Sequence, residues 1–523
     1  MPVSRTIQFL CALALVFVPA TALLAQAPAV ELDPRLPTAT ARILRSALES
    51  RDALVTGEDT TIERGALHLG SIVQIGGRLL IEGRVTDDVV AVGSEVTLRP
   101  GAEIGGDLTV LGGMLNGSTM AQVRGRQTWL REEPVRVDRT DPDRIYVAYE
   151  ARPAGFPIEP KGIWGIVVHE YNGVDGLAFG LAAGLKDLPG QPRTELAFGP
   201  VFRSERGDVG WDVVALREIP PAGITIGGRV HSITDTHQRW QRGDLANSFL
   251  SVVLADDDRT YFERTGYELW GERSFVRWPV TVRLRWRDDE YGSLESVEPF
   301  ALFDGSGDEG DRPNDGEPPE LDEDGWPVNP PIDEGRGRAL GLRAAFDSRN
   351  VPEYPTRGIL VSAQVDQWGF GGDYDFQWGL GDARLWVPLG GRSYAAVRAM
   401  GGGLLGDGEL PSQFLWRLGG AGSLAGYDAL IEPLVGEQMA LANVRAHLAL
   451  PGSAGMFETL YVVALADVGD AWSEGEDPEW RASVGGGLAA HGRLRYVGLF
   501  GAYGIEDETW KAVFVLSPWF DVP

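Results

Sequence analysis

"VTVRLRWR", Val280–Arg287, is the segment that separates the two fold classes open to this chain. Its apolar residues Val280, Val282, Leu284 and Trp286 alternate with Thr281, Arg283, Arg285 and Arg287. Successive side chains of a β-strand point to opposite faces, so one face is apolar and the other carries three arginines. A soluble sandwich would bury the apolar face in a core. A transmembrane barrel turns it towards lipid and turns the arginines into an aqueous lumen.

Composition favours the barrel. The chain has 16 tryptophans, and several lie near the ends of strand candidates, where interfacial aromatic girdles occur: Trp164, Trp211, Trp278, Trp386, Trp510 and Trp519. Strand-like alternation continues for roughly 360 residues without a helical segment, which exceeds a usual soluble β-domain. We therefore predict an all-β fold with a transmembrane antiparallel β-barrel of about 16 strands over residues 161–523.

The last strand candidate is "WKAVFVLSPWF", Trp510–Phe520. Every backbone polar group at membrane depth needs a partner, so we expect this strand to pair with the first one and close the sheet. It ends on Trp519-Phe520, which is similar to the terminal aromatic that barrel-assembly machinery recognises.

The N-terminus is typical of an exported protein. Residues 1–27 combine Arg5, a short apolar run and Ala25-Gln26-Ala27, which predicts a cleaved signal peptide. Cys11, the only cysteine, lies within it, so the exported part would contain none. Residues 28–56 predict a linking segment with a short helix after Pro37.

Residues 57–127 contain a repeat. "RVTDDVVAVGS" (Arg84–Ser94) aligns with "EIGGDLTVLGG" (Glu103–Gly113) at an offset of 19 residues. Short β-branched runs separated by glycine at a fixed interval indicate a small β-solenoid, and the segment resembles bactofilin repeats. The alternative is an ordinary small antiparallel β-domain. The charged residues 128–160 are predicted to be a linker.

The net charge of −28 argues against nucleic acid as a partner. Twelve acidic residues lie between Asp304 and Glu334, against Arg312 alone, which predicts a long solvated loop. Asp322–Gly325 within it lacks the full ligand spacing of a calcium loop, so no metal or other cofactor is expected.

Three motifs in the C-terminal half resemble those of the BamA/TamA outer-membrane superfamily, also called the bacterial surface antigen superfamily. They are a strand-turn motif in "AFDSRNVPEYPTRGILV" (Asp347, Arg349, Pro355, Gly358), a lumen-loop motif in "GGAGSLAGYDAL" (Ala425, Gly426, Tyr427, Asp428) and a barrel-wall motif in "LADVGDAW" (Asp467, Gly469, Asp470). In that family a long outer loop folds into the lumen, and its arginine pairs with an acidic residue on the wall.

The resemblance assigns Asp467 or Asp470 as the wall acid, but the arginine position holds Ala425. A buried acid needs another cation or water. Arg417, Arg445 and the lumen arginines Arg283, Arg285 and Arg287 are candidates, and the sequence selects none of them. The alternative is that Gly419–Leu430 is an exposed loop without lumen contacts.

The resemblance implies an outer-membrane protein that assembles or translocates other proteins through a seam between the first and last strands. Its expected partners are outer-membrane lipid, unfolded outer-membrane clients and periplasmic proteins, with the N-terminal domain in the periplasm. In the family, periplasmic POTRA modules receive the clients, and this sequence has the solenoid-like region in their place.

Two other functions compete with this reading. A passive channel or structural surface protein would use the lumen arginines to favour anions. A hydrolase is disfavoured, because none of the six histidines falls in H-E-x-x-H and no G-x-S-x-G is present. His231 and His237 form the only histidine cluster, and we expect both to be loop residues.

Overall fold

The computed structural model describes residues 28–516, with gaps at 51, 118–120, 126, 131–132, 142–143, 151–157, 162–165, 189–190, 220–221, 276–277, 298–299, 304–327, 350–353, 430–433, 452–456 and 493–494. The predicted signal peptide, Trp519-Phe520, Asp322–Gly325 and most of the acidic segment lie outside the described residues. Within the described ranges, no helix has both the length and the apolar character that a bilayer crossing requires.

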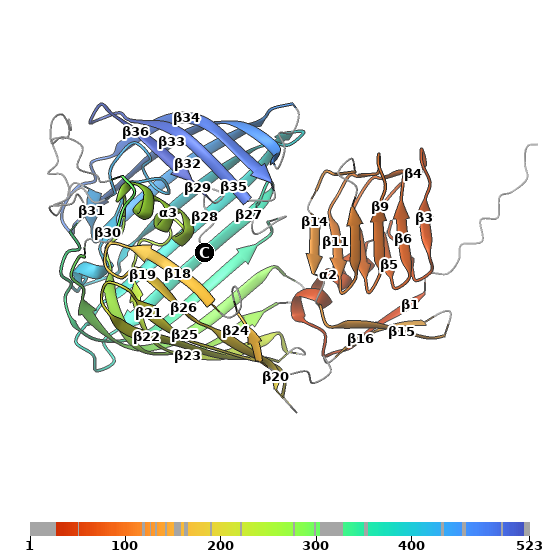
Figure 1. The fold of residues 1–523 in the computed structure, drawn as a ribbon, viewed down its shortest axis with the longest axis horizontal. Helices are drawn as coiled ribbons and strands as arrows, with labels where there is room; N and C mark the ends of the chain where they lie inside the picture. Colours follow the sequence, from red (N-terminus) through yellow and green to blue (C-terminus); the bar gives the residue numbers. More distant parts are fainter. Residues whose placement is uncertain are drawn as a thin grey trace, which may run out of the picture.

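A parallel β-solenoid opens the chain (Figure 1). Its strands are β2 (Leu54–Thr56), β3 (Thr60–Ile62), β4 (Leu67–His68), β5 (Ile72–Ile75), β6 (Arg78–Ile81), β7 (Arg84–Val85), β8 (Val89–Val92), β9 (Glu95–Leu98), β10 (Glu103–Ile104), β11 (Leu108–Leu111), β12 (Met114–Gly117), β13 (Gln122–Val123) and β14 (Gln127–Leu130). They form three sheets, in the orders β13-β10-β7-β4, β14-β11-β8-β5-β2 and β12-β9-β6-β3. The solenoid is therefore confirmed, and the antiparallel alternative is wrong.

The repeat sets the register of the coils. Val89 pairs with Leu108 at the 19-residue offset seen in the sequence, and the Asp107 amide donates to the Asp88 carboxylate over 2.7 Å. Residues facing the interior, such as Ile72, Val89 and Leu108, are fully buried. A stack of this kind hides a shared apolar core that no single coil could bury alone.

The predicted linker 128–160 is wrong, because it contains strands. After β14 come β15 (Val135–Asp141) and β16 (Arg144–Tyr149), which pair antiparallel, and β1 (Ala29–Leu32) lies parallel to β16. Charged residues alternate with buried Val135 and Val147, so the segment is a one-sided sheet, and its charge concealed that pattern. The expected helix is present as α2 (Thr38–Leu48).

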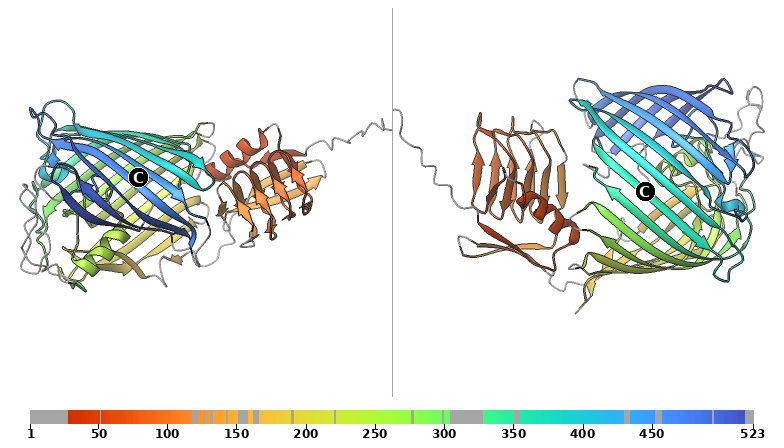
Figure 2. Two further views of the ribbon diagram at one scale, coloured as in Figure 1. Left: turned by 90° about the horizontal axis from the view of Figure 1, so that it is seen from above. Right: turned by 180° about the vertical axis from the view of Figure 1, so that it is seen from behind.

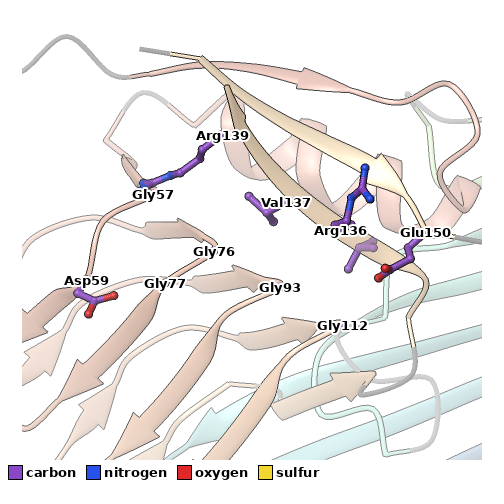
Figure 3. A pocket seen from close by; sticks show the side chains of 11 residues that line it. Gly57, Asp59, Gly76, Gly77, Gly93, Gly112, Arg136, Val137, Arg139 and Glu150 are labelled. Carbon is purple, nitrogen blue, oxygen red and sulfur yellow. The ribbon is translucent and has the colours of Figure 1, made fainter. Parts of the chain in front are cut away.

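The small sheet lies over a row of glycine corners (Figure 3). A Cβ at Gly112 would lie 2.2 Å from Val135 Cγ2, and one at Gly93 would lie 2.9 Å from Val137 Cγ2. Only glycine permits this approach at positive φ. A polar cleft of about 410 Å³ remains between the corners and β15, lined in part by Arg136 and Arg139.

The C-terminal part is one antiparallel sheet in which neighbours in sequence are neighbours in space. Its pieces are β17 (Ile158–Pro160), β18 (Ile166–Asn172), β19 (Gly176–Leu181), β20 (Ala183–Leu188), β21 (Gln191–Arg203), β22 (Asp208–Ile219), β23 (Ile224–Asp235), β24 (Phe262–Ser274), β25 (Val280–Ser293), β26 (Gly335–Asp347), β27 (Gly358–Trp368), β28 (Gln377–Gly390), β29 (Ser393–Leu404), β32 (Gln438–Ala449), β33 (Phe457–Trp472), β34 (Arg481–Gly492), β35 (Arg495–Gly504) and β36 (Thr509–Val515).

These 18 strand segments form 16 barrel strands, as expected. β18 pairs with β19 and β17 pairs with β20, while β19 and β20 both pair with β21. Two barrel strands are therefore interrupted and appear as two segments each: β17 and β18 form the first, and β19 and β20 form the second. Figures 1 and 2 show the curved sheet from three directions.

The two ends of the barrel differ. The connections from β23 to β24, β25 to β26 and β29 to β32 are long and lie at one end, whereas the opposite end has shorter turns. The solenoid lies beside the short-turn end (Figures 1 and 2), where Arg357 approaches Asp107 to 3.5 Å.

Exposure along the strands matches a lipid-facing outside. Leu284 of β25 is 52% exposed, while Arg287 is buried on the inner side. Trp211, Trp278 and Trp510 are exposed. Trp386 is not a girdle residue, as its ring is buried inside, 5.8 Å from the Arg349 guanidinium carbon.

The expected closing pair is not found: among the described residues, no strand pairing joins β36 to β18. Helix α3 (Asp244–Leu254), in the β23–β24 connection, packs on β18 and lies between the two terminal strands (Figures 1 and 2). We call the line between β18 and β36 the lateral seam. The expectation of no helical segment in this region was wrong, because DLANSFLSVVL is short and lacks a side-chain N-cap.

Candidate functional site

The candidate site is the loop segment 418–429 and the inner wall that it contacts. It belongs to the β29–β32 connection, which also contains the 3₁₀ turn η2 (Ser412–Phe414) and the paired β30 (Trp416–Arg417) and β31 (Val435–Gly436). Leu424 and Ala425 are fully buried, and Tyr427 is 2% exposed. The segment therefore lies inside the barrel, and the alternative of an exposed loop is wrong.

Glycine and Ser423 shape the segment. Gly419 has φ 115° and Gly420 has φ 76°, values that side-chain-bearing residues rarely adopt. The Ser423 hydroxyl accepts from the Gly419 amide over 2.6 Å and donates to the Gly419 carbonyl over 2.8 Å. The Gly420 amide donates to the Tyr427 carbonyl over 2.9 Å. The backbone therefore folds back on itself before it meets the wall.

Asp467 of β33 is the wall acid. Its carboxylate accepts from the Ala425 amide over 3.2 Å and from the Ser483 hydroxyl over 3.0 Å. Asn443 of β32 donates to it over 2.7 Å and also donates to the Ser423 carbonyl over 2.7 Å. The cation is Arg445, whose Nη1 donates to Asp467 Oδ1.

The cation beside Asp467 is therefore an arginine on the neighbouring wall strand, while the loop position that the resemblance assigns to arginine holds Ala425. Both partners of the Arg445–Asp467 pair have fully buried side chains. A buried carboxylate requires a charge partner and hydrogen bonds, and this one has both. With the cation on the wall, the small Ala425 places its backbone amide against the acid.

Tyr427 and its neighbours contact β34 and the last hairpin, β35–β36. The Tyr427 hydroxyl donates to the Ala482 carbonyl over 3.1 Å and to the Glu506 carboxylate. The Thr509 hydroxyl donates to the Gly426 carbonyl over 3.1 Å, and Asp428 forms an ion pair with Lys511 of β36. The loop thus ties the inner wall to the C-terminal strands.

Gly426 permits this contact. A Cβ there would lie 2.5 Å from the Gly504 nitrogen and 2.7 Å from the Tyr503 carbonyl carbon, and backbone atoms of that kind cannot move aside easily. Only a residue without a side chain lets the two backbones meet at this distance.

Asp470 and Gly469, the other wall candidates, lie apart from the loop. Asp470 accepts from the Glu479 amide over 2.6 Å and so stabilises the β33–β34 connection. Gly469 pairs with Leu441 and Arg481 within the sheet. Of the two acidic candidates, Asp467 is the one that accepts a hydrogen bond from segment 418–429.

The strand-turn motif lies at the short-turn end. Arg349 donates to both oxygens of Asp347, over 2.9 Å and 2.7 Å. Gly358 has φ 113°, and a Cβ there would lie 2.5 Å from the Ser348 carbonyl. Pro355 is buried in the same turn. The described residues of the motif therefore lie where β26 ends and β27 begins, away from the loop.

The lumen arginines have acidic partners. Arg283 lies 2.6 Å from Glu272, and Arg285 lies 3.2 Å from Asp366. Arg287 lies 4.0 Å from Glu268 and 5.5 Å from the Trp368 ring. They form a paired belt along the wall, separate from the Asp467 group.

The histidine cluster divides. His231 is on β23, contrary to expectation, where Arg264 Nε donates to it over 3.1 Å. His237 is in a connection and packs against Trp378 and Trp416. Among the described residues, no three His, Cys, Asp or Glu side chains are grouped as metal ligands.

Sequence reasoning missed Asn443, Ser483 and α3. Asn443 occupies an inward position on β32 two residues before Arg445, a spacing that places both on the Asp467 side. That period of two was a readable signal. Ser483 is brought to Asp467 by the β33–β34 register, which the sequence does not show.

Comparisons with known proteins gave a family match and several structural matches. Residues 334–492 match the Omp85 superfamily domain. Among solved structures, the chain is similar to BamA from Haemophilus ducreyi lacking POTRA domains 1-3, at 13% identity and TM-score 0.47, over 73% of this chain and 75% of that one.

CdiB from Acinetobacter baumannii is also similar, at 11% identity and TM-score 0.38 over 73% and 64% of the two chains. CdiB from Escherichia coli matches at 12% identity and TM-score 0.39 over 74% and 67%. No curated protein sequence matches the chain. The matched domain, residues 334–492, contains segment 418–429, Arg445 and Asp467, and the chain is therefore an outer-membrane β-barrel protein that carries an Omp85 superfamily domain.

Proposed function

We propose that this protein assembles or translocates other proteins at the outer membrane and is not itself an enzyme. The observation that carries the proposal is the lateral seam, where β18 and β36 have no strand pairing among the described residues. Unpaired strand edges template the addition of another strand. The Omp85 superfamily domain supports the same role, since proteins of the resembled family act through such a seam.

A passive anion channel fits the wall less well. Arg283 and Arg285 have close acidic partners, so their charge is largely compensated. At the long-loop end, the interior contains a buried cluster that includes Trp368, Phe414 and Leu418. Segment 418–429 and this cluster occupy the space that an open pore at that end would need.

The N-terminal unit is proposed to face the periplasm. It lies beside the short-turn end, and outer-membrane barrels have short turns on the periplasmic side. Its described residues form the solenoid and the small sheet, where the resembled family has POTRA modules. We infer that this unit contacts periplasmic partners or clients, while the barrel exterior contacts lipid.

The proposal is tested by depletion of the protein from the bacterium that encodes it. Folded outer-membrane barrels are then quantified by their heat-modifiable gel mobility, with and without the intact gene on a plasmid. We expect a loss of folded barrels, or of one secreted client, that the plasmid restores. Unchanged barrels together with reduced uptake of small anions would contradict the proposal and support the channel.

A further inference from the structure

Helix α3 occupies the lateral seam, and we propose that it is a removable seal: it must leave the edge of β18 before a client strand can add there. This inference rests on the proposed function, because it names how access to that seam is regulated. The incoming partner is an extended strand with alternating apolar side chains, which forms backbone hydrogen bonds that α3 does not.

Side chains of α3 and of the segment that follows it accept hydrogen bonds from amides of the first hairpin. The Tyr171 amide of β18 donates to Ser248 Oγ over 2.9 Å. That hydroxyl donates in turn to the Asp244 carbonyl over 2.8 Å, so its lone pair stays directed at the strand. The Gly173 amide, in the turn after β18, donates over 2.9 Å to the carboxylate of Asp257, which follows α3 in the same connection. Ser248 and Asp257 thus provide the acceptors that the backbone carbonyls of a neighbouring strand would otherwise provide.

Polar contacts hold the helix to the rest of its own connection and to β18. Buried Asn247 donates to Asp257 over 2.9 Å and to the Tyr261 hydroxyl over 3.0 Å. Arg259 links the two elements, since its Nη1 donates to Glu170 of β18 over 2.7 Å and to Asp244 of α3 over 2.8 Å. Water can replace such contacts when the helix moves, whereas a large apolar interface would have no comparable substitute.

The outer face of α3 is apolar. Leu245, Phe249 and Leu254 are 61%, 44% and 47% exposed. The Phe249 ring lies 5.2 Å from that of Phe514 on β36, so the helix contacts both sides of the seam. A helix with one apolar and one polar face binds at a membrane interface, which gives α3 a place to go once released.

The helix is also too short to be stable alone. It has 11 residues, and isolated helices of this length are marginal in water. Its folded state therefore depends on the contacts with β18 and β36. A strand that competes for the Tyr171 amide removes part of that support.

The test uses cysteine pairs, because Cys11 in the predicted signal peptide is the only native cysteine. The locked variant carries Phe249→Cys and Phe514→Cys, bridged by a short, reducible thiol cross-linker in cells depleted of the native protein. The control carries Val361→Cys and Ala383→Cys, which face each other on the lipid side of β27 and β28. That control locks two strands that are already paired.

We expect both pairs to cross-link. The locked variant should lose at least about tenfold in the yield of newly folded client barrels, reductant should restore it, and the control should keep full yield. Full yield from the cross-linked locked variant would overturn the seal, as would failure of its pair to cross-link while the control pair does. If the reduced variants and the native protein support no client folding, the proposed function fails, and cross-linking alone then decides whether α3 occupies the seam.

Discussion

Replacing Asp467 by asparagine should destabilise the barrel strongly, because it removes one member of a buried ion pair. Arg445 and Asp467 have fully buried side chains, and the carboxylate accepts hydrogen bonds from both the wall and the loop. Breaking such a pair on one side leaves an uncompensated charge, which costs about 3–5 kcal/mol. The asparagine amide would also turn one N–H₂ donor towards donors that need an acceptor.

The assay is the urea midpoint of the loss of heat-modifiable gel mobility for the purified protein in detergent micelles. Asp470→Asn is the matched control, since the same change there affects one hydrogen bond, from the Glu479 amide of the β33–β34 connection, and costs about 1 kcal/mol. Removing both charges, as Asp467→Asn with Arg445→Met, should recover much of the loss, because apolar replacements of buried pairs are often neutral. A midpoint for Asp467→Asn equal to that of the native protein would refute the reasoning.

Three further predictions follow from single contacts. Ala425→Arg should lower the free energy of unfolding by about 1–3 kcal/mol, seen as a lower urea midpoint, because the fully buried position lies beside Arg445. Adding Arg445→Ala to the same chain should recover stability. If that second change lowers the midpoint further, the two cations do not compete. Gly426→Ala should speed proteolysis within segment 418–429. Gly381→Ala should not, because the atom nearest to a Cβ at that position is 3.8 Å away. Equal proteolysis rates for the two variants would contradict the close contact at Gly426. In the N-terminal unit, Arg35 holds the pKa of Asp33 well below its ordinary value of 3.8, so the ionised Asp33 stabilises the fold above that value and this stabilisation is lost as the pH falls through the lower folded pKa. Hydrogen exchange between pH 4 and about pH 2 should show the loss in the native protein and not in Asp33→Asn. Identical profiles of the two proteins would contradict the prediction.

The barrel could be predicted because membrane strands have a simple period. Two features were sufficient to give the number of barrel strands: the alternation of apolar and polar residues, as in Val280–Arg287, and the length of the β-rich region. The 19-residue repeat likewise predicted the solenoid, since stacked coils require equal spacing. In both cases a local pattern repeats many times, so individual exceptions such as Trp386 do not change the result.

The site was harder to predict because its contacts depend on register and on long-range loop placement. The sequence suggested Asp467 and a missing loop arginine, but the choice of Arg445 depends on which β32 residue lies beside Asp467 and where the loop enters. Helix α3 was missed because its stability comes from β18 and β36, not from strong local signals. Residues 135–149 fall in the predicted linker because their charged residues outnumber the buried ones between them.

The claim that the edge of β18 receives client strands can be tested with a photoreactive amino acid at Val168, which is 64% exposed on that strand. The same probe at Val462 of β33, also lipid-facing and 41% exposed, is the control. The account predicts adducts with a strand of an unfolded client barrel at Val168 during its folding, and none at Val462. Normal client folding with no adduct at Val168, or with equal adducts at both positions, would contradict it.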